Sequence, residues 1–186
     1  MKLWIARHAA VPGARGLCYG ASDLAPDERA TVAAARGLAG ALPSGLRVRS
    51  SPLQRCARLA EALHALRPDL APQPDSRLAE MDFGDWEGRA WHALGRAALD
   101  AWTADFAHHR CGGGESVASF MARVREAFEE ARADGEVLWI THAGVVRAVR
   151  LLARGVTMVH DAREWPVEGL APAAWECIVL PGGSLS

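Results

Sequence analysis

Lysine is almost missing from this sequence of 186 residues, because Lys2 is the only one and every other basic side chain is an arginine. The chain also lacks an excess of charge of either sign, with a formal net charge of −1. A balanced charge gives no general attraction to nucleic acid or to anionic lipid, so we expect neither nucleic acid nor membrane as a partner. Any anion site must be local, and the position of an arginine then says more than its residue type.

Paired cysteines and metal-binding spacings are missing as well. The four cysteines are scattered along the chain, at Cys18, Cys56, Cys111 and Cys177. Without a CxxC motif or a histidine at zinc-finger spacing, they do not form a zinc site, and we expect buried or idle thiols. The pair His108-His109 has no third ligand at a convincing spacing. We therefore expect no metal ion.

Long apolar runs are absent from the N-terminus. The segment MKLWIARH has one basic residue before a very short apolar run that stops at Arg7. Such a run is far shorter than the core of a signal peptide or a membrane span. We therefore expect a cytoplasmic protein.

What the sequence does contain is an alternation of strand and helix patterns. Strands are expected at 2–6, 46–51, 136–141 and 175–180, with a strand or extended acidic segment at 76–88. Helices are expected at 26–42, 52–66, from the glycines at 112–114 to 135, and at 145–155. This order predicts an α/β fold, a three-layer α/β/α sandwich with a mostly parallel sheet. Residues 1–186 are expected to form a single domain, with a small cap insertion at about 81–115 that contains Trp86, Trp91 and Trp102 as packing residues.

Basic and imidazole side chains follow three of the predicted strands. Arg7 and His8 end the first strand, the second leads into a helix with Arg55 in its first turn, and His142 ends the third. The carboxyl ends of parallel strands share one edge of a sheet, which is where ligands bind in such folds. Glu80 ends another predicted strand and could supply an acid there.

These residue types fit the transfer of a phosphoryl group. Guanidinium groups hold phosphate oxygens through bidentate, charge-assisted hydrogen bonds that lysine cannot reproduce. A neutral imidazole can attack phosphorus and form a phosphohistidine, a role that suits His8. A carboxyl group can protonate the leaving alkoxide and then activate water, a role that suits Glu80.

Six short motifs occur together in one order: RHA, GLCYGASDL, SSPLQRC, LAEMDFGDWEG, GGGESV and ITHAG. With this set, nearly the whole chain resembles the phosphoglycerate mutase-like histidine phosphatase superfamily. The resemblance implies that His8 is the nucleophile and that Glu80 is the proton donor. It implies phosphate ligands at Arg7, Arg55 and His142, and further substrate contacts at Tyr19 and Gly20. It also implies no metal and no organic cofactor.

The chain departs from the family pattern beside the proposed nucleophile. The family commonly has glycine, an acidic residue, threonine and asparagine after the catalytic histidine, whereas this chain has Ala9, Ala10, Val11 and Ala14 there. Leu59 stands where the family usually has threonine. We expect a working site with altered contacts to the phosphate oxygens.

The expected function is hydrolysis of a small phosphorylated metabolite through a phosphohistidine. The motifs are most similar to those of the α-ribazole-5′-phosphate phosphatase-like branch of cobalamin synthesis, and the short cap favours a phosphatase over a mutase. Phosphoglycerate mutase-type transfer, a sugar or nucleotide phosphatase of broad specificity, a metal-dependent phosphatase and a non-catalytic module that binds a phosphorylated ligand stay open. Association into a homodimer is left open too.

Overall fold

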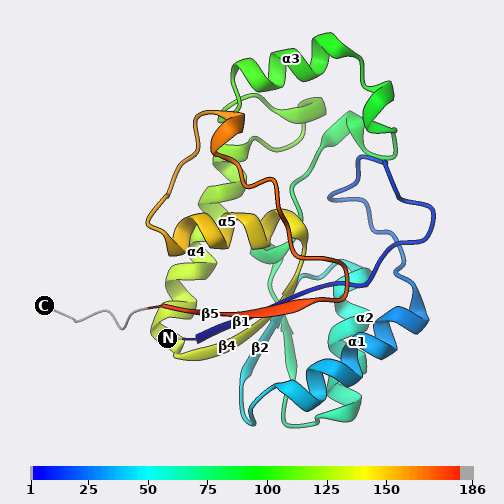
Figure 1. The fold of residues 1–186 in the computed structure, drawn as a ribbon, viewed down its shortest axis with the longest axis vertical. Helices are drawn as coiled ribbons and strands as arrows, with labels where there is room; N and C mark the ends of the chain where they lie inside the picture. The colour runs from blue at the N-terminus through cyan, green and yellow to red at the C-terminus, as the bar shows by residue number, and fades with distance from the viewer. Residues whose placement is uncertain (1, 181–186) are drawn as a thin grey trace, which may run out of the picture.

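The computed structural model describes residues 2–180 and contains a central sheet (Figure 1). Over these residues the sheet has five strands in the order β3-β2-β4-β1-β5. The strands are β1 (Lys2–Arg7), β2 (Arg47–Ser50), β3 (Pro72–Pro74), β4 (Glu136–Thr141) and β5 (Trp175–Val179). Strands β1 to β4 pair in parallel, and β5 joins the edge beside β1 in the antiparallel sense. The expected mostly parallel sheet is confirmed.

The register brings the carboxyl ends of three strands to one level. Ile140 of β4 lies opposite Ala6 of β1 on one side and opposite Ser50 of β2 on the other. The four residues from Val137 to Ile140 are completely buried, because helices cover both faces of this central strand. Side chains just beyond β1, β2 and β4 therefore start from the same edge.

Helices cover the sheet on both faces. On one face, α1 (Glu28–Ala41) and α2 (Gln54–Leu66) bury apolar side chains such as Leu38 and Leu63 against β2 and β4. On the other face, α4 (Val117–Asp134) and α5 (Ala143–Ala153) contribute Phe120, Phe128 and Val149 to a second cluster. This is the expected three-layer sandwich. No helix within residues 2–180 is long and apolar enough to cross a membrane.

Local signals explain where the helices begin. The Asp27 side chain accepts a hydrogen bond from the Ala30 amide and so caps α1. Ser116 and Ser119 form a reciprocal capping box at the start of α4. The glycines at 112–114 thus precede the helix and lie in a turn, rather than in its first residues.

The expected cap contains a helix of its own. Helix α3 (Arg96–Ala104) lies far from the sheet, beside the 3₁₀ turn Ala162–Glu164 of the segment that leads to β5 (Figure 1). Trp86 is buried in the core, while Trp91 and Trp102 keep part of their surface exposed. The cap therefore combines an insertion after the sheet residue Pro74 with a segment close to the C-terminus.

The expectation of a strand that ends at Glu80 is wrong. The strand in this region is β3, which lies at the sheet edge, where proline is tolerated. The Asp75 carboxylate then accepts a hydrogen bond from the Arg77 amide, which begins a 3₁₀ turn over Ser76–Leu78. Glu80 follows that turn in an irregular segment, so a loop and not a strand places this carboxyl group.

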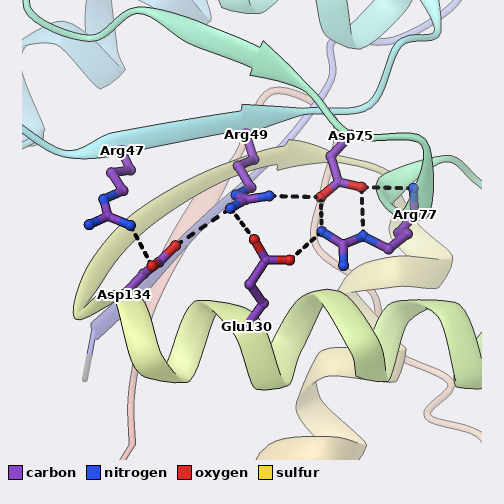
Figure 2. Close-up of polar contacts among 6 residues, drawn as sticks. All are labelled: Arg47, Arg49, Asp75, Arg77, Glu130 and Asp134. Carbon is purple, nitrogen blue, oxygen red and sulfur yellow. Dashed lines mark hydrogen bonds and ion pairs between the residues drawn. The ribbon is translucent and has the colours of Figure 1, made fainter.

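A network of ion pairs joins the β2–β3 edge to α4 (Figure 2). Arg49 lies 3.3 Å from Asp75 and 3.5 Å from Asp134, and Arg77 lies 2.7 Å from both Asp75 and Glu130. The six members of the network are Arg47, Arg49, Asp75, Arg77, Glu130 and Asp134. Because Asp75 begins the turn that leads to Glu80, this network anchors the start of the Glu80 segment to α4.

Candidate active site

The proposed nucleophile, His8, leaves the end of β1 and is almost fully buried, with 2% of its surface exposed. Its Nδ1 lies 2.6 Å from the Ala9 carbonyl oxygen, which can only accept, so Nδ1 carries the proton. The other ring nitrogen, Nε2, is then the one with a free lone pair. Burial, aided by the charges of Arg55 and Arg7, lowers the pKa of His8 to about 3, so the imidazole is neutral at pH 7.

Arg55, in the first turn of α2, is completely buried. Its Nε–H donates to Nδ1 of His142 at 3.2 Å, and its terminal nitrogens donate to the carbonyl oxygens of Ser22 and Gly20. The Tyr19 ring lies 5.4 Å from the guanidinium carbon. Among residues 2–180, no carboxylate lies within ion-pair distance of Arg55. A buried cation without an anionic partner is costly, and a bound anion would compensate that cost.

Arg7 also has a guanidinium without an ion pair among the described residues. One terminal nitrogen donates to the Leu170 carbonyl oxygen at 2.7 Å, and its Nε is buried with no hydrogen-bond partner. Most of the paired arginines lie elsewhere on the molecule, as in the network of Figure 2. The structure thus leaves donors of two adjacent arginines available beside His8.

His142 begins α5 and is completely buried. Its ring centre lies 5.1 Å from that of His8. Because Nδ1 accepts from Arg55, the ring proton is on Nε2, which lies 2.8 Å from the Ser51 hydroxyl. Burial, with the Arg55 charge next in importance, holds the pKa of His142 well below its usual range. In this arrangement His142 orients Arg55, and a direct contact with phosphate stays a prediction.

The Glu80 carboxylate is held at the start of α5. Its Oε2 accepts a hydrogen bond from the Gly144 amide at 2.9 Å, and its Oε1 accepts from the Met81 amide at 3.2 Å. A Cβ atom at Gly144 would lie 2.1 Å from Oε1. The close approach of this carboxylate therefore requires glycine at position 144, although the φ angle there is ordinary.

A cavity of about 540 Å³ opens above these residues. Five residues predicted for the site line it, namely Arg7, His8, Tyr19, Arg55 and Glu80. His142 and Gly20 are not among the lining residues, and they lie behind Arg55. The structure therefore brings together the proposed nucleophile, the proposed proton donor and two of the proposed phosphate ligands in one space.

Gly20 allows the loop that carries Tyr19 to pack closely against the backbone of Met81. A Cβ atom there would lie 1.8 Å from the Met81 carbonyl oxygen, so no other residue fits without a shift of the backbone. Its amide donates to the Glu87 carboxylate, which also accepts from the amides of Ala21, Ser22 and Phe83. The contact of Gly20 with substrate stays a prediction. Glu87 itself was not singled out from the sequence, although it lies in the quoted motif LAEMDFGDWEG.

Arg147 is the second functional candidate that sequence reasoning missed. It lies one helical turn after Gly144 on α5, lines the cavity and donates to the Val167 carbonyl oxygen at 3.2 Å. Its Nε is buried without a partner. Burial lowers the pKa of Arg147, and the nearby charge of Glu80 opposes this effect. The sequence did contain a signal for Arg147, because a residue three positions after Gly144 lies on the same face of the helix.

The alanine-rich stretch after His8 offers few donors. Ala9 is completely buried, and the carbonyl oxygen of Ala10 accepts from the Asp27 amide that precedes α1. Leu59 is buried in the cluster beneath α2. These positions support the fold, and the arginines remain the main donors around the cavity. Within residues 2–180, no group of three histidine, cysteine or acidic residues is placed to hold a metal ion.

Comparison with known proteins gives matches over nearly the whole chain. The protein TTHB049 from Thermus thermophilus is 33% identical over 97% of this chain and 95% of its own, with a TM-score of 0.74. A structure described as phosphoglycerate mutase from the same organism is 33% identical over 97% and 94%, with a TM-score of 0.73. The mycobacterial glucosyl-3-phosphoglycerate phosphatase Rv2419c is 26% identical over 95% and 88%, with a TM-score of 0.78.

No curated protein sequence matches the chain. The family model described as histidine phosphatase superfamily (branch 1) matches residues 3–181. That span covers the strands and helices described above from the second residue of β1 onward, together with His8, Arg55, Glu80 and His142. By this match the chain belongs to the histidine phosphatase superfamily, branch 1.

Proposed function

We propose that this protein hydrolyses phosphate monoesters of small metabolites through a phosphohistidine on His8. The observation that carries the proposal is the set of arginines around one cavity. Arg7, Arg55 and Arg147 line it beside a neutral His8, and within residues 2–180 none of the three has a carboxylate at ion-pair distance. A phosphate dianion supplies the missing negative charge. The named relatives include a mutase and a phosphatase, which supports phosphoryl transfer.

The first step forms a bond between Nε2 of His8 and phosphorus while the bond from phosphorus to the ester oxygen breaks. The electron pair of that bond goes to the leaving oxygen, which takes a proton from the Glu80 carboxyl group. Proton donation of this kind accelerates reactions by about 10²–10⁴-fold. The alcohol leaves, and phosphohistidine and the Glu80 carboxylate remain.

The second step transfers the phosphoryl group to water. The Glu80 carboxylate takes a proton from a water molecule as that water attacks phosphorus, and the bond from phosphorus to Nε2 breaks. Its electron pair returns to the imidazole, which becomes neutral again. Inorganic phosphate leaves and Glu80 is protonated for the next turnover, so no metal ion or organic cofactor enters the cycle.

For the finer assignment, we propose hydrolysis rather than mutase transfer, because the cap is short. α-Ribazole 5′-phosphate is the first substrate to try, since the motifs resemble those of that branch. Several aromatic rings line the cavity, which is compatible with the aromatic base of this molecule. A location in the cytoplasm and association into homodimers remain predictions from the sequence.

The test is turnover of p-nitrophenyl phosphate with EDTA present, followed by the same assay on His8→Ala. We expect hydrolysis that is insensitive to EDTA and lost in the variant. A brief reaction with labelled substrate is expected to leave an acid-labile, alkali-stable phosphoprotein in the parent protein only. His160→Ala is the matched control, because His160 is exposed and is not among the residues that line the cavity.

The same assay separates the alternatives. Turnover that persists in His8→Ala contradicts the phosphohistidine, and loss of turnover in EDTA favours a metal-dependent phosphatase. Phosphate binding without turnover, weakened by Arg7→Gln and Arg55→Gln, favours a binding module. With active protein, a panel of α-ribazole 5′-phosphate, 3-phosphoglycerate and sugar phosphates ranks the substrates.

A further inference from the structure

Aromatic rings form most of the cavity wall away from His8. They come from four parts of the chain: the segment after Glu80, helix α3 with the turn that follows it, helix α4, and the segment before β5. The six rings are those of Phe83, Trp91, Trp102, Phe106, Phe120 and Trp165. Aromatic rings that only filled a hydrophobic core would be fully buried. Four of these rings instead keep part of their surface exposed, namely Phe83, Trp91, Trp102 and Trp165. The rings thus border space that is available to a ligand.

The rings hold one another in place. Trp102 stacks on Trp91 with ring centres 6.3 Å apart and on Phe106 at 5.4 Å, while Phe83 meets Trp91 edge-on at 5.4 Å. Trp165 meets Phe106 edge-on at 6.3 Å and so links the segment before β5 to the cap. Mutual packing limits the side-chain entropy lost when a ligand binds. The apolar wall is therefore formed before the ligand arrives.

Charge is confined to the other end of the cavity. The charged or titratable lining residues beyond Tyr19 are Arg7, His8, Arg55, Glu80 and Arg147. The charges of both Glu80 and Arg7 act on Arg147, which places Arg147 at the catalytic end. Thr103 adds a hydroxyl to the wall, but this hydroxyl donates to the carbonyl oxygens of Leu99 and Asp100 in its own helix.

We infer that the cavity takes phosphate monoesters whose alcohol portion is a bulky, uncharged aromatic group. This inference rests on the proposed function, because the phosphate must lie beside His8 for the alcohol portion to reach the aromatic wall. A cavity of about 540 Å³ has room for a two-ring group beyond the phosphate. A carboxylate would lose its water against this wall without finding a partner, so alcohols that carry a negative charge are disfavoured.

The test compares substrates whose leaving alcohols have similar acidity, so that intrinsic reactivity does not decide the result. These are 2-(1-naphthyl)ethyl phosphate, ethyl phosphate and 3-phosphoglycerate. We expect kcat/KM for the naphthylethyl ester to exceed that for ethyl phosphate by about 10²-fold, from burial of the aromatic rings. 3-Phosphoglycerate is expected to be the poorest of the three.

Two variants locate the preference in the wall. Trp102→Leu in the cap and Trp165→Leu in the segment before β5 are each expected to reduce the naphthylethyl preference about tenfold, with little effect on ethyl phosphate. Trp4→Leu is the control, because Trp4 packs against the other core cluster. If the parent protein hydrolyses all three substrates equally, or prefers 3-phosphoglycerate, the inference is overturned while the proposed function stands.

A binding experiment makes the inference independent of turnover. The non-hydrolysable 2-(1-naphthyl)ethylphosphonate and ethylphosphonate are titrated into the full chain by calorimetry. We expect the aromatic phosphonate to bind about 10²-fold more tightly, and less tightly to Trp102→Leu. Absence of turnover with this binding preference contradicts the phosphatase but supports the cavity assignment, whereas equal affinities overturn it.

Discussion

At the scale of single residues, burial decides the protonation of the site. His8 and His142 are both withdrawn from water, and arginine charges lie beside them, so both imidazoles resist protonation. A neutral imidazole is required for attack on phosphorus. The folded state therefore keeps the proposed nucleophile neutral over a wider pH range than an exposed histidine would allow.

The neutral state of the buried His8 imidazole lowers the stability of the folded protein at low pH. The folded pKa of His8 is about 3, below the usual value of 6.5, so between these values the unfolded chain binds more protons than the native one. Stability is expected to fall as pH drops through this window, by about 2 kcal/mol from His8 alone between pH 7.5 and 5. Urea denaturation of the parent protein and of His8→Gln at pH 7.5 and 5 measures the difference.

His8→Gln is expected to lose less stability than the parent protein over that interval. His160→Gln is the control, because His160 is exposed and its replacement should leave the pH dependence unchanged. Parallel pH profiles for the parent protein and His8→Gln would falsify the assignment of a strongly lowered pKa to His8.

Gly144 provides a test of the proposed proton donor. Gly144→Ala places a Cβ atom 2.1 Å from Oε1 of Glu80, so the carboxylate must move away from the α5 amide. We expect kcat for an alkyl phosphate to fall about 10²-fold, because its alkoxide needs a proton. The burst of p-nitrophenol from p-nitrophenyl phosphate should fall far less, because p-nitrophenolate leaves without one.

Gly40→Ala is the matched control for Gly144→Ala. Gly40 lies in α1, and a Cβ atom added there would meet no heavy atom within 4 Å, so alanine fits. Equal losses of the p-nitrophenol burst and of alkyl phosphate turnover in Gly144→Ala would show that the substitution disturbs phosphorylation of His8 instead of proton donation.

At the scale of elements, charge pairs hold the segment that leads to Glu80. Burial disfavours the ionised form of Asp75, but hydrogen bonds and charge from Arg77, with Arg49, outweigh this and lower its pKa. A carboxylate with a lowered folded pKa stabilises the native state above its unfolded pKa, and this contribution is lost as pH falls through the folded pKa. The network should therefore weaken in acid and in high salt.

Asp75→Asn tests this contribution. At pH 7 we expect a loss of about 1–3 kcal/mol in the free energy of unfolding, because Arg49 and Arg77 lose a buried partner. The difference from the parent protein should shrink as pH falls through the folded pKa of Asp75, where the carboxyl group becomes protonated in both states. Asp161→Asn is a close control, because Asp161 pairs with Arg163 through the same local motif at an exposed site.

The elements also show where sequence patterns succeed. The strand that ends at Arg7 and the strand that precedes His142 are apolar runs with few exposed side chains, and burial of that kind leaves a strong signal. β3 was not predicted, and a strand was wrongly expected up to Glu80, because prolines and acids there suit an edge strand followed by a turn as well as an extended segment. Hydrogen bonds of Asp75 with Arg77 decide between them.

At the scale of the whole molecule, the convergence of His8, Arg55 and His142 follows from topology. Parallel strands in one sheet share an edge, so residues at their carboxyl ends meet without any knowledge of side-chain detail. The alternation of strands and helices was enough to predict this edge, and the family motifs were enough to propose roles for its residues. The strand and helix patterns and the family motifs are both short stretches of consecutive residues, so they can be recognised in the sequence without the structure.

Other features depend on contacts between distant segments. The orientation of His142 toward Arg55, the loop held by Glu87, the position of Arg147 in the cavity and the aromatic wall arise where the cap and the segment before β5 fold over the sheet edge. Side-chain direction there depends on packing between parts of the chain far apart in sequence, so periodicity cannot report it. The order of residues thus determined which side chains meet at the sheet edge, and only tertiary packing decided how those side chains are oriented and which residues line the cavity.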